Sequence, residues 1–224
     1  PAGSFVSLVG ESGCGKSTIA GILAAKNRGY NGEIIIGGVP LNEVNEINLM
    51  QRVVLVRHNS YLFKGTVEEN LKMAKPDATK EEMEAVLQKV NLLGFLQTQD
   101  GLQTQLLEKA SNLSGGQCQR LVIARALLKE DSKVYIFDEA ASNIDVESEE
   151  LIMNVIHNLA KTKTVLLISH RLANVVKSDK IYFLKDGEIK ESGKHEELMS
   201  QNGAYRHLYE SQMALENYGK GGVA

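Results

Sequence analysis

The sequence predicts an α/β fold with a mainly parallel sheet, an antiparallel β edge and an inserted α-helical subdomain. Two apolar, β-branched runs, 134–137 and 164–168, are separated by a segment of helical periodicity, and this alternation is typical of parallel sheets. Asp186-Gly187 joins two further strand-like runs and is a strong signal for a two-residue hairpin. A polar, helix-permissive stretch separates the early strands from the later ones and predicts the insertion.

These signals predict a single domain whose parts are not contiguous in the chain. We expect the domain to span 1–224, with an α/β core made of 1–60 and 126–218, a helical subdomain over 61–125, and a disordered tail over 219–224.

The composition is that of a globular chain with a substantial core. Of its 224 residues 43% are hydrophobic, so we expect it to fold without disulfides. With 25 Lys and Arg against 28 Asp and Glu, the formal charge is −3, and no basic excess indicates binding of nucleic acid. The two cysteines fit a reducing compartment. No apolar run approaches the roughly 18 residues of a membrane helix, so we expect no direct lipid insertion by this chain.

The first elements are a strand, a glycine-rich loop and a helix. Residues 4–9 alternate as in a strand, and 19–26 are rich in Ile, Leu and Ala, as in a helix. Between them the chain fits the pattern G-x-x-x-x-G-K-[ST] at every fixed position. The loop consists of Gly10, Glu11, Ser12, Gly13, Cys14, Gly15, Lys16, Ser17 and Thr18.

This loop predicts a phosphate-binding site in a P-loop NTPase (RecA-like) core. Glycines allow left-handed backbone dihedrals and close approach to a ligand, so successive N–H groups converge on phosphates at the positive end of the helix. We expect Lys16 to reach the β and γ phosphates and the Ser17 hydroxyl to bind Mg²⁺. The alternative is a glycine-rich surface turn that happens to carry a lysine.

The next elements are two strands and an amphipathic helix. The run 33–37 is β-branched and bounded by glycine turns, which predicts a strand. The run 52–56 is apolar enough for a strand buried on both faces. Thr79 and Glu82 form a capping-box pattern, and apolar residues follow at helical spacing, so a helix is expected to begin there.

The later helices differ in how much of their surface is apolar. The run 121–128 is apolar nearly all round, which predicts a helix buried against several neighbours. The stretch 194–217 predicts two helices near the end of the chain.

Two adjacent carboxylates, Asp138 and Glu139, follow the apolar run 134–137 directly. Placing carboxylates at the tip of a buried strand is costly unless a cation meets them, and beside a phosphate loop that cation is Mg²⁺. We expect Asp138 to hold the metal and Glu139 to polarise the water that attacks the γ phosphate. The alternative is a helix cap that follows the strand.

A second phosphate-binding pattern precedes the buried helix. Leu113-Ser114-Gly115-Gly116-Gln117 would place serine and glycine N–H groups at a helix N-terminus, ready for an anion. Alone this pattern is equally consistent with an ordinary cap. Together with the Lys16 loop, however, it gives one chain two phosphate-binding sites. Either the chain binds two nucleotides, or each nucleotide is bound between two chains.

These segments, in this order along the chain, resemble the ATP-binding cassette family. The resemblance covers essentially the whole sequence, and its signature motif separates this family from other P-loop ATPases. The matching segments are Gly10–Thr18 (Walker A), Leu113–Gln117 (signature motif), Val134–Glu139 (Walker B), Ser142–Asp145 (D-loop) and Ser169-His170 (switch histidine).

The resemblance implies an ATPase that uses ATP and Mg²⁺ and forms a head-to-tail dimer with a second cassette. ATP on Walker A of one chain would be clamped by the signature motif of the other. The residues implied in that clamp are Ser114, Gly115, Gly116 and Gln117. Asp145 would lie near the dimer axis, and His170 would contact the γ phosphate.

Within this family, the sequence resembles the cassettes of exporters. Tyr61–Leu71 is similar to the segment that exporter cassettes present to the coupling helices of their transmembrane domains, and Glu108 stands where exporters carry a glutamate facing the same domains. This implies a place at the cytoplasmic face of the cell membrane, as part of an integral membrane transporter. Exporter membrane domains precede the cassette in one polypeptide, so this chain is expected to be a piece of a longer one.

The sequence departs from the family pattern at two main places. His58 stands where the family usually has glutamine, and its imidazole can still bind a metal or accept a hydrogen bond from a metal-bound water. The aromatic residue that stacks on adenine in the family would lie upstream of residue 1, and such stacking is typically worth about 1 to 3 kcal/mol. Asn143 in the D-loop, where the family often has alanine, is a minor change.

Two other functions compete with an exporter ATPase. One is a regulatory half of a heterodimeric transporter that binds ATP with little hydrolysis, and His58 is its only support. The other is a cassette ATPase of DNA repair or translation, which the exporter-like segment and the charge balance disfavour. The transported substrate would be chosen by a membrane domain.

Overall fold

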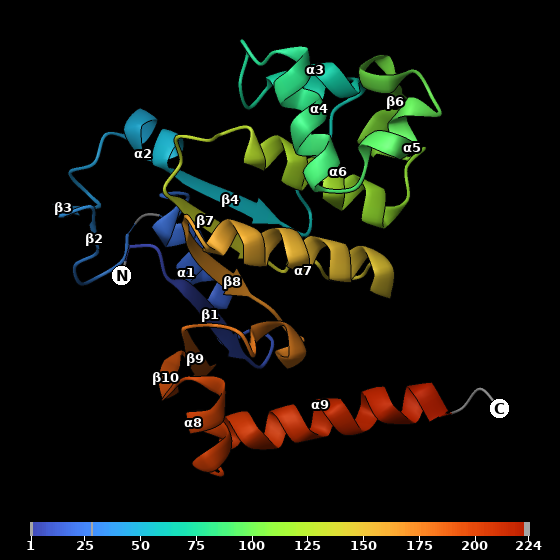
Figure 1. Cartoon of the computed structure of the whole chain (residues 1–224). Coiled ribbons are helices and arrows are strands. Elements are labelled where there is room, and N and C mark those ends of the chain that lie inside the picture. Colours follow the sequence, from blue (N-terminus) through green and yellow to red (C-terminus); the bar gives the residue numbers. More distant parts are fainter. Residues whose placement is uncertain (1, 28, 222–224) are drawn as a thin grey trace.

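The computed structural model describes residues 2–27 and 29–221 (Figure 1). The strands are β1 Phe5–Gly10, β2 Ile35–Ile36, β3 Val39–Pro40, β4 Val53–Arg57, β5 Gly65–Thr66, β6 Gln105–Leu106, β7 Val134–Asp138, β8 Thr164–Ile168, β9 Lys180–Lys185 and β10 Glu188–Gly193. The α-helices are α1 Lys16–Leu23, α2 Glu46–Arg52, α3 Val67–Lys72, α4 Lys80–Lys89, α5 Leu93–Gln97, α6 Gly115–Leu127, α7 Val146–Ala160, α8 His195–Ser200 and α9 Ala204–Gly221. Short 3-10 helices are η1 Gly101–Gln103, η2 Glu108–Ala110 and η3 Leu172–Val175.

The central sheet has the strand order β10-β9-β1-β8-β7-β4. Each pairing from β9 to β4 is parallel, and β10 pairs with β9 in the antiparallel sense. Glu188 pairs with Lys185 across the Asp186-Gly187 turn. The predicted α/β class, with a mainly parallel sheet and an antiparallel edge, is therefore confirmed.

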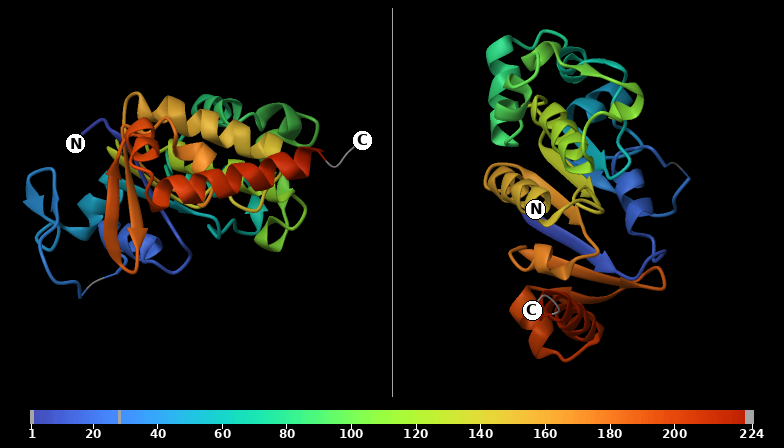
Figure 2. Two further views of the ribbon diagram at one scale, coloured as in Figure 1. Left: turned by 90° about the horizontal axis from the view of Figure 1, so that it is seen from below. Right: turned by 90° about the vertical axis from the view of Figure 1, so that its right-hand side faces the viewer.

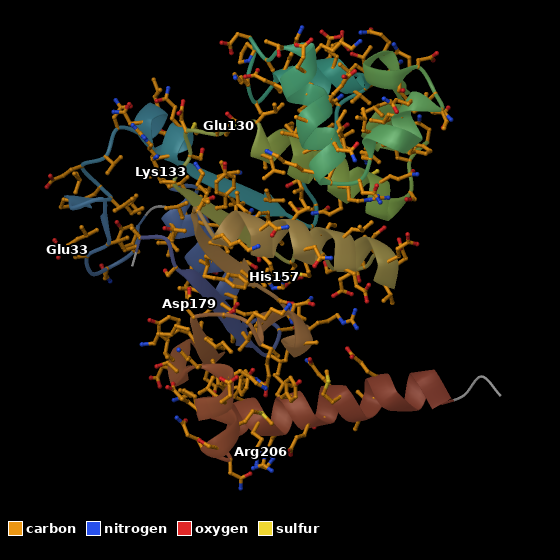
Figure 3. The ribbon with its side chains drawn as sticks, in the orientation of Figure 1. Glu33, Glu130, Lys133, His157, Asp179 and Arg206 are labelled. Carbon is orange, nitrogen blue, oxygen red and sulfur yellow. The ribbon has the colours of Figure 1, made fainter. Side chains whose placement is uncertain are left out.

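Helices cover both faces of this sheet, with α1 and α7 on opposite sides (Figure 2). The alternation of side chains along β7 explains the two layers. Tyr135 and Phe137 are buried on the side of α6 and α7, and Ile136 is buried on the side of α1. His157 of α7 packs edge-on against the Phe5 ring of β1 (Figure 3).

The helices α3, α4 and α5 lie together at one end of the molecule, far from α8 and α9 at the other (Figure 1). Capping boxes begin α3 at Thr66 and α4 at Thr79, and α4 packs against α6 through an apolar layer. The expected helix after Thr79 is thus present, and α6 is buried along the predicted run. This arrangement brings α6 from the helical end of the molecule down to the sheet.

Three expectations about boundaries need correction. The run 33–37 contributes only the two-residue strand β2, which pairs with β3 in a small sheet separate from the central one. The first helix begins at Lys16 and ends at Leu23, earlier than expected, because its N-terminus lies inside the phosphate loop. The tail expected to be disordered over 219–224 overlaps α9, which continues to Gly221 as the end of an 18-residue helix; residues 222–224 lie outside the described residues.

Both helices expected over 194–217 are present as α8 and α9. Throughout residues 2–27 and 29–221, no helix combines the length and apolar character required to cross a bilayer.

Candidate functional site

Four loops meet at one edge of the sheet because they follow the carboxyl ends of parallel strands. The Lys16 loop follows β1, His58 follows β4, Glu139 follows β7, and His170 stands two residues after β8. Ligands of open α/β sheets bind at this edge. The topology therefore places the residues expected to carry chemistry on neighbouring loops.

The Lys16 loop has the backbone shape of a phosphate cradle. Gly10 has a φ of 143°, and a Cβ there would lie 2.0 Å from the carbonyl oxygen of Leu184 in β9, so a larger residue cannot be accommodated. Gly15 has a φ of 104° and precedes the first residue of α1, whose helical N–H groups face the loop. The strand, loop and helix context predicted for the motif is confirmed.

Lys16 lies at the centre of this loop and is buried. Its Nζ donates to the carbonyl oxygens of Gly10 at 2.9 Å and Glu11 at 2.8 Å, and it lies 3.6 Å from Cys14 Sγ. These contacts hold the ammonium group against the backbone of the loop, and its role in phosphate binding stays a prediction.

Ser17 and Asp138 are brought together although 121 positions separate them in the sequence. The Ser17 hydroxyl donates to Asp138 Oδ1 at 2.9 Å, and the carboxylate is buried. Over the described ranges no group of three or more His, Cys, Asp or Glu side chains is arranged to hold a metal. Mg²⁺ at nucleotide sites takes one or two protein oxygens and completes its shell with phosphate oxygens and water, so this pair of hard oxygens fits it.

A cation that the sequence reasoning missed lies beside Asp138. Arg57 is the last residue of β4 and pairs with Asp138 in the parallel register, with its Nε 3.5 Å from Asp138 Oδ2. That Nε is buried and has no hydrogen-bond partner among the described residues. The available signal was a charged residue at the end of an otherwise apolar strand.

Glu139 and His170 form a direct contact over the phosphate loop. His170 Nε2 lies 2.6 Å from Glu139 Oε1. Both side chains line one cavity of about 340 Å³ together with residues of the loop. The loop residues in that lining are Ser12, Gly13, Gly15, Lys16, Ser17 and Thr18.

The Ser114 segment is the start of a helix, as the sequence predicted. Ser114 caps α6 through a capping box with Gln117, with its hydroxyl accepting from the Gln117 N–H at 3.1 Å. Gly116 packs so closely on α7 that a Cβ would lie 2.2 Å from Ser148 Oγ and 3.0 Å from Asp145 Oδ2. The signature segment and Asp145 are therefore neighbours, while the cavity over Lys16 is lined by other residues.

His58 occupies a less central place than its predicted metal role requires. Its backbone N–H donates to the Asp138 carbonyl at 3.1 Å, and its side chain is exposed. The lining of the 340 Å³ cavity does not include it. A metal-binding role for the His58 imidazole stays a prediction.

Comparison with known proteins identifies the family. A family model described as "ABC transporter" matches residues 1–142. The chain belongs to the ABC transporter family. The resemblance of its motifs to the ATP-binding cassette family is thereby confirmed.

This ABC domain also resembles several individual proteins. An uncharacterized ABC transporter ATP-binding protein of Haemophilus influenzae is 50% identical over 208 residues, which are 93% of this chain and 37% of that protein. An ATP-dependent lipid A-core flippase of the same species is 41% identical over 216 residues, 96% of this chain and 37% of that protein. A solved structure of a bacterial Atm1-family ABC exporter with ATP bound matches with a TM-score of 0.88 at 33% identity, over 94% of this chain and 37% of that one.

The ABC domain spans a little over one third of the length of these relatives. Its family match shows that it is an ABC nucleotide-binding domain, and it is similar to the corresponding domains of exporters; domains of this family are ATPases that use ATP and Mg²⁺. The expectations for fold, enzyme class and cofactors are confirmed.

Proposed function

We propose that this domain is the ATP-hydrolysing motor of an ABC exporter. It closes head to tail on a second cassette when ATP binds and reopens after hydrolysis, and this cycle drives an attached transmembrane domain. The family match and the exporter relatives support this reading.

The observation that carries the proposal is the separation of two phosphate-binding features. Lys16, Glu139 and His170 line one cavity, and the capped N-terminus of α6 at Ser114 lies outside that lining. One ATP has a single γ phosphate. The simplest arrangement is therefore that the N-terminus of α6 at Ser114 of a second chain binds the ATP held by the Lys16 loop of the first.

The residues that line the cavity can be given distinct tasks. The Glu139 carboxylate accepts a proton from the attacking water, and His170, held against that carboxylate, contacts the transferred phosphate. Lys16 and the N–H groups of its loop stabilise the charge that develops on the phosphate oxygens. Mg²⁺, held by Ser17 and Asp138, would neutralise charge on the β and γ phosphate oxygens.

The predicted docking of a membrane domain is supported by a second cavity, of about 390 Å³, beside the helical end of the molecule. Its rim carries Phe63 and Met73, whose side chains are 48% and 53% exposed, together with Arg125 and Lys129. Exposed apolar side chains rimmed by charge are typical of protein interfaces. We propose that coupling helices bind here, with 61–125 acting as a helical subdomain, and that the domain works at the cytoplasmic face of the membrane.

A regulatory half with little hydrolysis would bind ATP through the same loop. Three features weigh against it, since Glu139, His170 and the Ser114 cap are all in place. Turnover by the purified chain distinguishes the two functions.

The head-to-tail site is tested by mixing two inactive variants. Lys16→Ala removes the phosphate-binding amine and Ser114→Arg blocks the signature end, so each variant alone should lose ATP hydrolysis. In a mixed dimer, the intact Lys16 loop of one chain faces the intact Ser114 of the other. A 1:1 mixture should regain roughly a quarter of the wild-type rate, because half of the dimers are mixed and each has one complete site of two.

The control adds Glu139→Gln to the Ser114→Arg chain, which should abolish the regained activity because the one complete site then lacks its base. An active wild-type chain whose variants never complement each other would contradict the head-to-tail site. A wild-type chain without turnover at any concentration would favour the regulatory half.

A further inference from the structure

The loop that carries His170 is tied to the C-terminal helix by one amide side chain. Gln212 of α9 donates from Nε2 to the His170 carbonyl at 2.6 Å and accepts at Oε1 from the Leu172 N–H at 2.9 Å. The two bonds flank Arg171, so they fix the backbone on both sides of it. The side-chain amide of Gln212 therefore binds the same loop through both its NH₂ donor and its carbonyl acceptor.

An ion pair next to this amide ties the same loop to two helices. Arg171 donates to Glu216 of α9 from Nη2 at 2.8 Å and from Nε at 3.2 Å. Arg171 also pairs with Glu149 of α7, and the second Glu149 oxygen accepts from Asn174 Nδ2 at 2.7 Å. Because the Glu149 carboxylate is buried, losing these partners would be unfavourable, so Arg171 has little freedom to move.

The geometry of α9 explains why these contacts occur together. Gln212 and Glu216 are one helical turn apart and share a face. The same face begins at Tyr205, which is fully buried, and continues through Leu208, which packs on the core. Figure 2 shows α9 running along the side of the molecule that carries η3, which it contacts. The helix therefore continues from the core directly to the loop after β8.

We propose that Gln212 is a positioning residue for ATP hydrolysis, holding the His170 backbone so that the imidazole stays against Glu139. The Arg171–Glu216 pair keeps α9 in place for this task. The inference rests on the proposed function, because it assigns α9 a part in the same site. On this assignment, the rate of ATP hydrolysis depends on α9. ATP binding does not, because the Lys16 loop is held by its own contacts.

The test uses Gln212→Met in the full chain, which keeps the length of the side chain and removes both hydrogen bonds. We expect kcat to fall about tenfold while KM for ATP changes less than about twofold. The matched control is Glu210→Gln, also on α9, which removes an ion pair with Arg206 (Figure 3) and should leave kcat unchanged.

A double-mutant cycle separates positioning from a general structural role. In a His170→Ala background, Gln212→Met should cause no further fall in kcat, because its effect passes through His170. A further tenfold fall there, or a raised KM with unchanged kcat, would overturn the inference. If Gln212→Met does not fold, Glu216→Gln replaces it, with an expected fall of about threefold and the same requirement for His170.

The outcomes also separate this inference from the proposed function. If His170→Ala hydrolyses ATP as fast as wild type, the assignment of His170 fails and the inference fails with it. If His170→Ala is slow and the Gln212 and Glu216 variants match wild type, the proposed function stands and the inference alone is wrong.

Discussion

The imidazole Nε2 of His170 lies 2.6 Å from Oε1 of Glu139, joining the loops after β8 and β7 at the 340 Å³ cavity that both side chains line. Glu139 has a φ of 56°, a left-handed conformation that glutamate rarely adopts, and its N–H donates to the Ile168 carbonyl at 3.0 Å. Strained residues are concentrated at functional sites. The contact makes Glu139 the first residue to test.

Glu139→Gln should abolish most hydrolysis without preventing ATP binding. The amide keeps the size of the side chain and can still meet His170, but it cannot take a proton from water. We expect phosphate release to fall by roughly 10² to 10⁴, about 3 to 5 kcal/mol of barrier. A fluorescent ATP analogue should bind with unchanged affinity. Unchanged turnover would show that another group is the base.

Lys16→Ala should weaken ATP binding by at least about 30-fold, because a charge-assisted contact to phosphate is lost. Binding is measured by titration with the same fluorescent analogue. Lys161→Ala is the control, since the Lys161 ammonium contacts Asn158 at the end of α7 and neither residue lines the cavity over the loop. Equal affinity in wild type and Lys16→Ala would show that the loop is a surface turn.

Gly116→Ala and Gly115→Ala should differ sharply in stability. A Cβ at Gly116 would lie 2.2 Å from Ser148 Oγ and 2.6 Å from Ser148 Cβ, whereas one at Gly115 would meet Ile144 at an ordinary 3.8 Å. Forcing a methyl group into a packed contact costs about 1 to 3 kcal/mol. Urea unfolding should therefore show a clear loss for Gly116→Ala and a small change for Gly115→Ala. A loss for Gly116→Ala as small as that for Gly115→Ala would mean that the α6–α7 contact adjusts easily to the added methyl group.

Arg57→Gln should lower the Mg²⁺ concentration needed for half-maximal hydrolysis about three- to fivefold. The guanidinium lies 3.5 Å from Asp138 and competes with the metal for that carboxylate, and the Arg57 side chain of the pair is partly exposed. His58→Ala, measured in parallel, tests the predicted metal role of the neighbouring imidazole, because loss of a ligand would raise the Mg²⁺ requirement. A Mg²⁺ dependence unaffected by Arg57→Gln would show that the ion pair does not oppose the metal.

Stability should fall in acid through the cap of α7. The Ser148 N–H donates to Asp145 Oδ1 at 2.8 Å, and this bond, with a smaller contribution from the Ser148 side chain, lowers the pKa of Asp145. Since the folded pKa is below the unfolded one, the stabilisation is complete above about pH 4 and is lost as pH falls through the folded pKa. Thermal melts of Asp145→Asn, which keeps an acceptor, should show a weaker pH dependence. If the melting temperature depended on pH identically in wild type and variant, the Asp145 cap would not be a source of the acid sensitivity.

The sequence alone predicted most of the strands and the loops that follow them. Apolar runs bounded by glycine, and a glycine-rich loop before a helix, are local signals, so the order of elements and the roles expected of Lys16 and Glu139 could be inferred without a structure. Local signals failed where neighbours decide the boundary, as at β2, whose residues turn into a hairpin with β3.

Tertiary structure decided which distant residues meet. Arg57 reaches Asp138 because β4 and β7 are neighbouring parallel strands, and Gln212 reaches His170 because α9 packs back along the loop after β8. The two residues of each pair are far apart in sequence and do not belong to one motif, so no spacing rule could have connected them. The sequence by itself determined which chemical groups each loop carries, and the packing of strands and helices determined which charges and backbone groups lie against them.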